Sequence, residues 1–223
     1  MSMYNKDKFL EKTTETLGEI FDMLSKLPAI LLKDLEKERT VLVIVDMVNG
    51  FAREGALMSP RVEGLITGIS ELSEYCDQLH IAKLAFADSH TEASPEFDAY
   101  PLHCMEGSSE VEMVDELKII GGYTLIPKNS TNGFLEEEFQ KWLKENETIN
   151  TFIITGDCTD ICVQQFAVTL KCWFNRLNKK ARVIVPVNAV ETYDLGLHDG
   201  DLMNVVALYN MSINGIELVA EVK

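Results

Sequence analysis

The sequence predicts an α/β protein with a doubly wound, mostly parallel six-stranded sheet and helices on both faces. Two observations support this prediction. Runs of β-branched, apolar residues alternate along the chain with helix-like stretches, and the strongest runs are apolar almost throughout, as strands covered on both faces must be. Strands that alternate with helices in this way are joined by right-handed crossovers in a parallel sheet.

The clearest expected strand is 40–48, TVLVIVDMV, which is apolar except for one charge near its end. The other expected strands repeat that form, and they are 80–90, the weaker 123–130, 148–157, 181–190 and 215–221. The expected helices have apolar residues at helical spacing, and they are 61–79, 133–145, 160–175 and 199–211. Each helix then connects two neighbouring strands in the chain.

Residues 1–39 are expected to form an N-terminal amphipathic helical extension, and residues 40–223 a single domain. In this extension, apolar side chains recur at helical spacing until Pro28, which is expected to end the helix. The apolar positions are Phe9, Leu10, Leu17, Ile20, Phe21 and Leu24. The helix is expected to pack against the domain or against a second subunit, and the chain is expected to form a homo-oligomer.

Composition excludes several classes of partner. The formal net charge is −16, from 36 acidic and 20 basic side chains, and this opposes binding to nucleic acid. No apolar run approaches the roughly 20 residues that span a bilayer, and the N-terminus lacks the apolar core of a signal peptide. The five cysteines are an odd number, which favours reduced thiols. We therefore expect a cytoplasmic protein that binds neither nucleic acid nor membrane.

Polar residues with catalytic chemistry lie at or just beyond the ends of four expected strands. Asp46, Asp88 and Lys128 end the first three, and Cys162 lies just beyond the fourth. Ligands of open parallel sheets bind at this edge. Taken singly, Asp46 could be a turn cap, Lys128 a surface lysine and Cys162 a small buried hydrophobic residue. Together they fit a division of labour, in which a lysine lowers the pKa of a thiol and an aspartate takes its proton.

The loop ITGDCTDICVQQFAV, residues 154–168, contains two cysteines four residues apart. Cys162 is expected at the start of a helix, whose dipole favours a thiolate nucleophile. Cys158 lies in the preceding turn, where its backbone N–H could join that of Cys162 in stabilising an oxyanion. Asp160, between them, is expected to cap the helix.

Three potential metal ligands lie within a short stretch of the chain: Asp88, His90 and His103. Residues 88 and 90 point to the same face of an extended segment, and a later histidine can complete a three-ligand site with open positions. Imidazole and carboxylate ligands suit Zn, Fe or Mn. A surface loop with ordinary histidines is the alternative.

The motifs VIVDMVNGF, ADSH followed by YPLHC, IPKNS and GDCTDICV resemble, as a set, the isochorismatase-like cysteine hydrolases and in particular their nicotinamidase branch. The similarity runs from about residue 40 to residue 219. The resemblance implies a catalytic triad of Asp46, Lys128 and Cys162. It also implies an oxyanion hole formed by the backbone N–H groups of Cys158 and Cys162, and a cis peptide bond between Asp157 and Cys158.

The same resemblance implies a bound divalent metal ion, zinc in the first instance and iron or manganese as alternatives, held by Asp88, His90 and His103. It also implies that Phe51 and Tyr100 contact the substrate. The expected reaction is hydrolysis of the amide bond of a small molecule, in the first instance nicotinamide to nicotinate and ammonia, through a thioester on the cysteine.

Four positions depart from the nicotinamidase pattern. They are Val48, Gly50, Tyr100 and Thr131, and two of the usual aromatic residues are among those replaced. Aromatic walls hold a flat ring by stacking, so these changes weaken the case for nicotinamide in particular. A related hydrolase of another small amide, a ureide or a carbamoyl compound is therefore the alternative. A non-catalytic protein that keeps the fold for binding or assembly is a third possibility.

Overall fold

The computed structural model describes residues 5–223, and within them it contains one seven-stranded sheet in which all pairings are parallel. The strands are β1 (Thr40–Val45), β2 (Ala82–Asp88), β3 (Tyr123–Lys128), β4 (Thr151–Asp157), β5 (Arg182–Pro186), β6 (Val190–Glu191) and β7 (Glu217–Val219). The predicted α/β fold is confirmed. The predicted strand 181–190 is divided into β5 and the two-residue β6 by a 3-10 turn at Val187–Ala189.

The helices that connect these strands match the four predicted segments, with two additions. The structure contains α1 (Lys6–Leu24), α2 (Asn49–Ala52), α3 (Pro60–Glu63), α4 (Ile66–Leu79), α5 (Asp115–Ile120), α6 (Glu137–Glu145), α7 (Gln164–Arg176) and α8 (Gly200–Ile213). Predicted helix 61–79 corresponds to α3 and α4. The short α2 and α5 were not predicted, because four to six residues contain too few turns to show a helical period.

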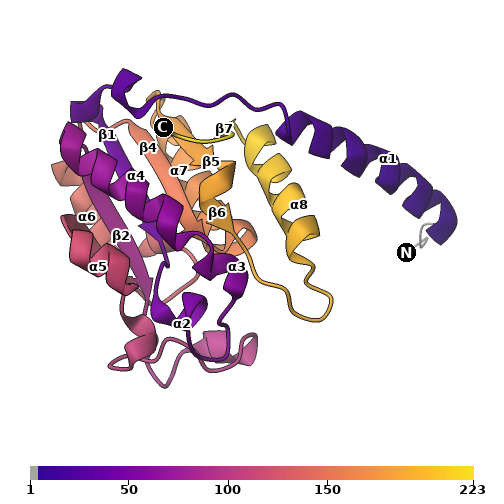
Figure 1. Cartoon of the computed structure of the whole chain (residues 1–223), viewed down its shortest axis with the longest axis horizontal. Helices are drawn as coiled ribbons and strands as arrows, with labels where there is room; N and C mark the ends of the chain where they lie inside the picture. The colour runs from indigo at the N-terminus through magenta and orange to yellow at the C-terminus, as the bar shows by residue number, and fades with distance from the viewer. Residues whose placement is uncertain (1–4) are drawn as a thin grey trace.

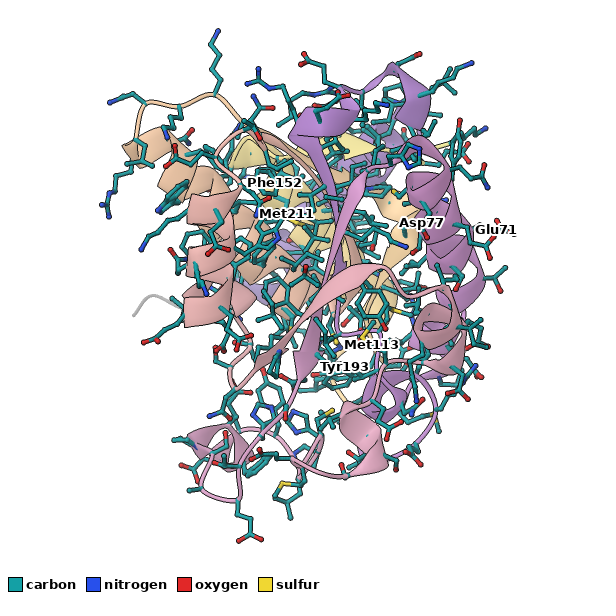
Figure 2. All side chains as sticks on the ribbon, turned by 90° about the vertical axis from the view of Figure 1, so that its left-hand side faces the viewer. Glu71, Asp77, Met113, Phe152, Tyr193 and Met211 are labelled. Carbon is teal, nitrogen blue, oxygen red and sulfur yellow. The ribbon has the colours of Figure 1, made fainter. Side chains whose placement is uncertain are left out.

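Helices cover the sheet on both faces, with α4 and α5 on one and α6, α7 and α8 on the other (Figure 1). This is why β1 is apolar throughout, since alternate residues of a strand point to opposite faces. Phe152 of β4 and Met211 of α8 belong to the hydrophobic core between the sheet and the helices α6, α7 and α8 (Figure 2). The β1 side chains divide into Val41, Val43 and Val45 on the α7 side and Leu42 and Ile44 on the α4 side.

The order of the strands across the sheet is β3-β2-β1-β4-β5-β7, with β6 beside β4. The chain therefore builds outward from β1 to β3 and then returns to place β4 on the other side of β1. Such a reversal leaves a crevice at the carboxyl ends of the two central strands, where open α/β sheets bind ligands. Asp46 follows β1 at this position, and Cys158 follows β4.

The N-terminal helix α1 extends from the body of the molecule beside α8 (Figure 1), and none of its residues is buried. The segment after it is tied to the C-terminal end of the chain, where Ile30 donates its amide proton to Glu221 and accepts one from Lys223. No helix within residues 5–223 is long and apolar enough to cross a membrane. All five cysteines are free thiols. The division of the chain at residue 39 stays a prediction.

Candidate active site

The structure brings Asp46, Lys128 and Cys162 together at the carboxyl edge of the sheet. The Lys128 ammonium lies at the centre, with Nζ 2.9 Å from Asp46 Oδ2 and 3.7 Å from Cys162 Sγ. All three side chains are buried. Neither Asp46 oxygen accepts a hydrogen bond of good geometry from residues 5–223. A buried carboxylate with free lone pairs beside a thiol is available to take its proton.

Burial and the ion pairs set the proton affinities of these groups. Burial raises the pKa of Asp46 from 3.8 to about 6, although Lys128 opposes the rise. Burial also raises the pKa of the Cys162 thiol well above its usual value, and Lys128 only partly offsets this. As expected, Lys128 acts to lower the pKa of the thiol. Burial raises that pKa by more, so the net pKa is not lowered as expected. At neutral pH the resting pair is an ionised Asp46 and a protonated Cys162.

The backbone at the ends of β1 and β4 is shaped to present Asp46. This residue has a φ of 55°, in the left-handed region that non-glycine residues rarely adopt. On the neighbouring strand, Gly156 has a φ of 109° and lies against Val45, so that a Cβ on it would be 1.9 Å from the Val45 carbonyl oxygen. Only glycine fits this close approach of two strands. The peptide bond between Asp157 and Cys158 is cis, as the resemblance implied.

Asp88, His90 and His103 form a second buried cluster that shares the same lysine. Asp88 Oδ1 accepts a hydrogen bond from Lys128 Nζ at 2.6 Å, while Oδ2 faces the Nε2 atoms of His90 and His103 at 2.8 and 3.1 Å. Burial opposes the charge on Asp88, but Lys128 and the two histidines outweigh it and hold the pKa of Asp88 below its usual range. The three candidate ligand atoms lie within 4.8 Å of one another.

The hydrogen bonds of the two imidazole rings orient this cluster to bind a cation. His103 Nδ1 lies 2.8 Å from the carbonyl oxygen of Pro101, which can only accept, so Nδ1 carries the proton. The other ring nitrogen, Nε2, faces the Asp88 carboxylate. His90 Nδ1 similarly lies 3.0 Å from Asn129 Oδ1. Histidines that bind metals have this arrangement, in which the outer nitrogen donates and the inner one coordinates.

The loop after β4 places the two expected oxyanion donors beside the pocket. Thr159–Val163 form a π-helical turn, and Cys162 lies within this turn, one residue before its end and two residues before α7 begins. The Cys158 carbonyl accepts hydrogen bonds from Ile161 and Val163, both at 3.1 Å, while its amide donates none to the described residues 5–223. The Cys158 N–H is therefore free to bind a substrate oxygen.

The expected role of Asp160 as a helix cap is wrong. Its carboxylate makes no capping hydrogen bond to the turn. Instead Oδ1 accepts a hydrogen bond from the Thr192 hydroxyl at 2.7 Å, and Oδ2 lies 2.9 Å from His198 Nε2. Both partners are more than thirty residues later in the chain, so sequence spacing gave no sign of them.

A narrow pocket lies against both Cys162 and the cluster of Asp88, His90 and His103. Its lining includes Cys158 and Cys162 together with Asp88 and His103. Aromatic rings form much of the remaining wall, and they come from Phe51, Tyr100 and Tyr193. The first two of these were expected at the substrate. The structure adds Tyr193 and Glu96, whose carboxylate lies 3.7 Å from His90 Nε2; neither belongs to a sequence motif that marked it.

A wider groove of about 780 Å³ lies at the opposite, amino edge of the sheet, near Thr151 and Arg182. It contains lysines and asparagines but no thiol, and parallel sheets bind substrates at their carboxyl edge. The narrow pocket is therefore the candidate active site.

Comparisons with known proteins agree with this site. The Isochorismatase domain matches residues 40–214 of the chain. The chain belongs to the isochorismatase family. It is 33% identical to Nicotinamidase 1 of Arabidopsis thaliana over 240 aligned positions, which cover 91% of this chain and 96% of the relative.

Two solved structures share this fold. The pyrazinamidase of Pyrococcus horikoshii, solved in complex with zinc, superposes with a TM-score of 0.68 at 24% identity, covering 81% of this chain and 98% of that one. The N-carbamoylsarcosine amidase of Thermoplasma acidophilum superposes with a TM-score of 0.66 at 25% identity, covering 81% and 95%. The expected family and fold are thus confirmed.

Proposed function

We propose that this protein is a cysteine amidohydrolase that converts nicotinamide to nicotinate and ammonia. The observation that carries the proposal is the buried group of Asp46, Lys128 and Cys162, beside a pocket with aromatic walls and a free backbone N–H. The extent of the similarity to a plant nicotinamidase, across nearly the whole chain, supports nicotinamide as the substrate.

In the first half of the reaction, Cys162 Sγ attacks the amide carbon as Asp46 takes the thiol proton. Lys128 stabilises the negative charge on both groups. The carbonyl oxygen becomes an oxyanion, which accepts hydrogen bonds from the backbone N–H groups of Cys158 and Cys162. When the C–N bond breaks, Asp46 gives its proton to the leaving nitrogen, so that ammonia departs and a thioester remains.

The second half uses the same groups in the opposite order. Asp46, now ionised again, takes a proton from a water molecule that attacks the thioester carbon. The C–S bond breaks, nicotinate is released, and the proton returns to the Cys162 sulfur. The pKa of about 6 suits Asp46 to this exchange, because the group must both accept and donate a proton near neutral pH.

We propose that a divalent ion, zinc in the first instance, is held by Asp88, His90 and His103. The buried set of one carboxylate and two imidazoles, with outer nitrogens engaged by oxygen acceptors, suits zinc, iron or manganese. When bound, the ion would act as a Lewis acid toward a ring nitrogen or oxygen of the substrate. Asp88 would remain paired with Lys128 through its other oxygen.

The test is ammonia release by the purified protein from nicotinamide, pyrazinamide and an N-carbamoyl amino acid. We expect turnover of nicotinamide, and a loss of that turnover in Cys162→Ala. Turnover of the carbamoyl compound alone would favour the second candidate, which the absence of an aromatic side chain at Thr131 supports. Absence of turnover with all three substrates, from metal-loaded protein, would contradict an amidohydrolase.

We also propose that the chain forms a homo-oligomer through α1 and the neighbouring surface of α8. Both helices expose large apolar side chains, with Phe21 62% and Ile213 64% exposed. Such surfaces are commonly covered by a partner. Sedimentation equilibrium of the full chain should give a mass above that of the monomer, and deletion of residues 1–25 should lower it. A monomer at all concentrations would contradict this. A cytoplasmic location stays a prediction.

A further inference from the structure

The loop between β6 and α8 carries one wall of the pocket. Thr192 is fully buried and Tyr193 faces the pocket, after which the chain runs out into solvent, where Leu197 is fully exposed. It turns back at once, because Leu195 and His198 exchange both backbone hydrogen bonds, at 3.0 and 2.9 Å. The labelled Tyr193 lies in the lower half of the molecule in Figure 2.

The turn lays His198 flat against the Tyr193 ring. The two ring centroids are 4.0 Å apart and the planes differ by 8°. His198 Nδ1 also lies 2.8 Å from the Tyr193 carbonyl oxygen, so the contact fixes both the backbone and the ring of Tyr193. Such stacking orients an aromatic side chain that has only two freely rotating bonds.

Asp160 anchors this pair to the nucleophile. It lies in the π-helical turn two residues before Cys162, and its two oxygens hold the residue before Tyr193 and the histidine stacked on it. The side chains of Asp160 and His198 are 15% and 19% exposed, so solvent weakens this contact only in part. The hydrogen bonds and the ring stacking that join Asp160, Thr192, His198 and Tyr193 thus fix the pocket wall relative to the thiol.

We propose that Tyr193 is a specificity-determining residue that holds the flat ring of the substrate, and that His198 is a positioning residue that acts through Tyr193. The inference rests on the proposed function, which supplies an aromatic amide as substrate. Phe51 and Tyr100 line the same pocket, so a planar ring bound there would have aromatic neighbours from separate parts of the chain. Burial raises the pKa of Tyr193 to about 12, so its ring stays uncharged beside the reacting sulfur.

The test compares Tyr193→Ala, Tyr193→Phe and His198→Ala with Leu197→Ala, a matched control in the same loop. Stacking on one aromatic face changes affinity by up to roughly tenfold. For nicotinamide we expect Tyr193→Ala to raise KM about tenfold with little change in kcat, Tyr193→Phe, which keeps the ring face, to raise it much less, and Leu197→Ala to resemble the wild type. For acetamide, which has no ring, the KM of Tyr193→Ala should equal that of the wild type.

A double variant isolates the role of His198. If the histidine acts only through the tyrosine, His198→Ala raises KM for nicotinamide, and adding it to Tyr193→Ala raises KM no further. Additive effects of the two substitutions would overturn the positioning role. An unchanged KM in Tyr193→Ala, with an active wild type, would overturn the specificity role.

A second measurement does not depend on turnover. Removing the Tyr193 ring opens the pocket, so iodoacetamide should label Cys162 several times faster in Tyr193→Ala than in Leu197→Ala, as followed by mass spectrometry of the peptide that contains it. Equal labelling rates would contradict the claim that the Tyr193 ring forms a wall of the pocket. If the wild type has no activity on nicotinamide but labelling is faster in Tyr193→Ala, the proposed function is refuted. The claim that Tyr193 forms a wall of the pocket is then still supported.

Discussion

Replacing Asp46 by asparagine should make the protein more stable and inactive at once. Burial raises the pKa of this carboxyl from 3.8 to about 6, so the folded state favours its protonated form. A group of this kind contributes its full stability below the unfolded pKa and loses it as the pH rises through the folded one. Each pKa unit is worth about 1.4 kcal/mol, so ionised Asp46 lowers the free energy of unfolding by about 3 kcal/mol at neutral pH.

Asparagine resembles the protonated side chain in shape and cannot ionise. Urea unfolding at neutral pH should therefore show Asp46→Asn to be more stable than the wild type by about 3 kcal/mol, and the difference should shrink to less than about 1 kcal/mol near pH 4. Asp34→Asn, which alters an exposed carboxylate, should follow the wild type at both pH values. Ammonia release should be lost only in Asp46→Asn, because amide oxygen is a far weaker base.

Two outcomes would refute the reasoning. If Asp46→Asn is no more stable than the wild type at neutral pH, Lys128 stabilises the carboxylate by more than burial disfavours it. If the stability difference is the same at both pH values, it does not come from ionisation of this group. The expected result would show that Asp46, as a catalytic base, lowers the stability of the fold while activity requires it.

Two further predictions concern the metal cluster and the strand ends. His90→Ala should lose the bound metal measured by plasma emission spectroscopy, whereas His80→Ala, outside the cluster, should keep it; equal metal contents would contradict the assigned ligands. Gly156→Ala should fail to fold or show a much lower Tm, because its methyl group would lie 1.9 Å from the Val45 carbonyl oxygen. Gly68→Ala on α4 has open space around it and should have a Tm equal to or slightly above that of the wild type, and a normal Tm in Gly156→Ala would contradict the close approach.

The fold could be predicted because its signals are local. A fully apolar β1 can only be a strand covered on both faces, and polar residues directly after buried strands must gather at one edge. The collection of Asp46, Lys128 and Cys162 at that edge follows from the parallel direction of the strands, whose carboxyl ends share one edge. Short elements such as α5 gave no such signal.

The pKa values of the site and the pocket wall formed by Tyr193 could not be predicted in this way. The pKa of Cys162 depends on how deeply it is buried, which neither its neighbours in sequence nor the nearby lysine reveal. Asp160 looked like a local cap, but its partners Thr192 and His198 come from a loop near the other end of the chain. Tyr193 reaches the pocket through that same loop. Contacts of this length are set by the packing of the whole sheet.

The central claim is that Cys162, and not Cys158, is the nucleophile. The most direct measurement is ammonia release from nicotinamide by the wild type, Cys158→Ala and Cys162→Ala, after each metal-loaded protein has been shown to be folded by circular dichroism. We expect substantial activity in Cys158→Ala, which keeps its backbone N–H, and none in Cys162→Ala. Activity retained by Cys162→Ala, or lost only in Cys158→Ala, would contradict the account.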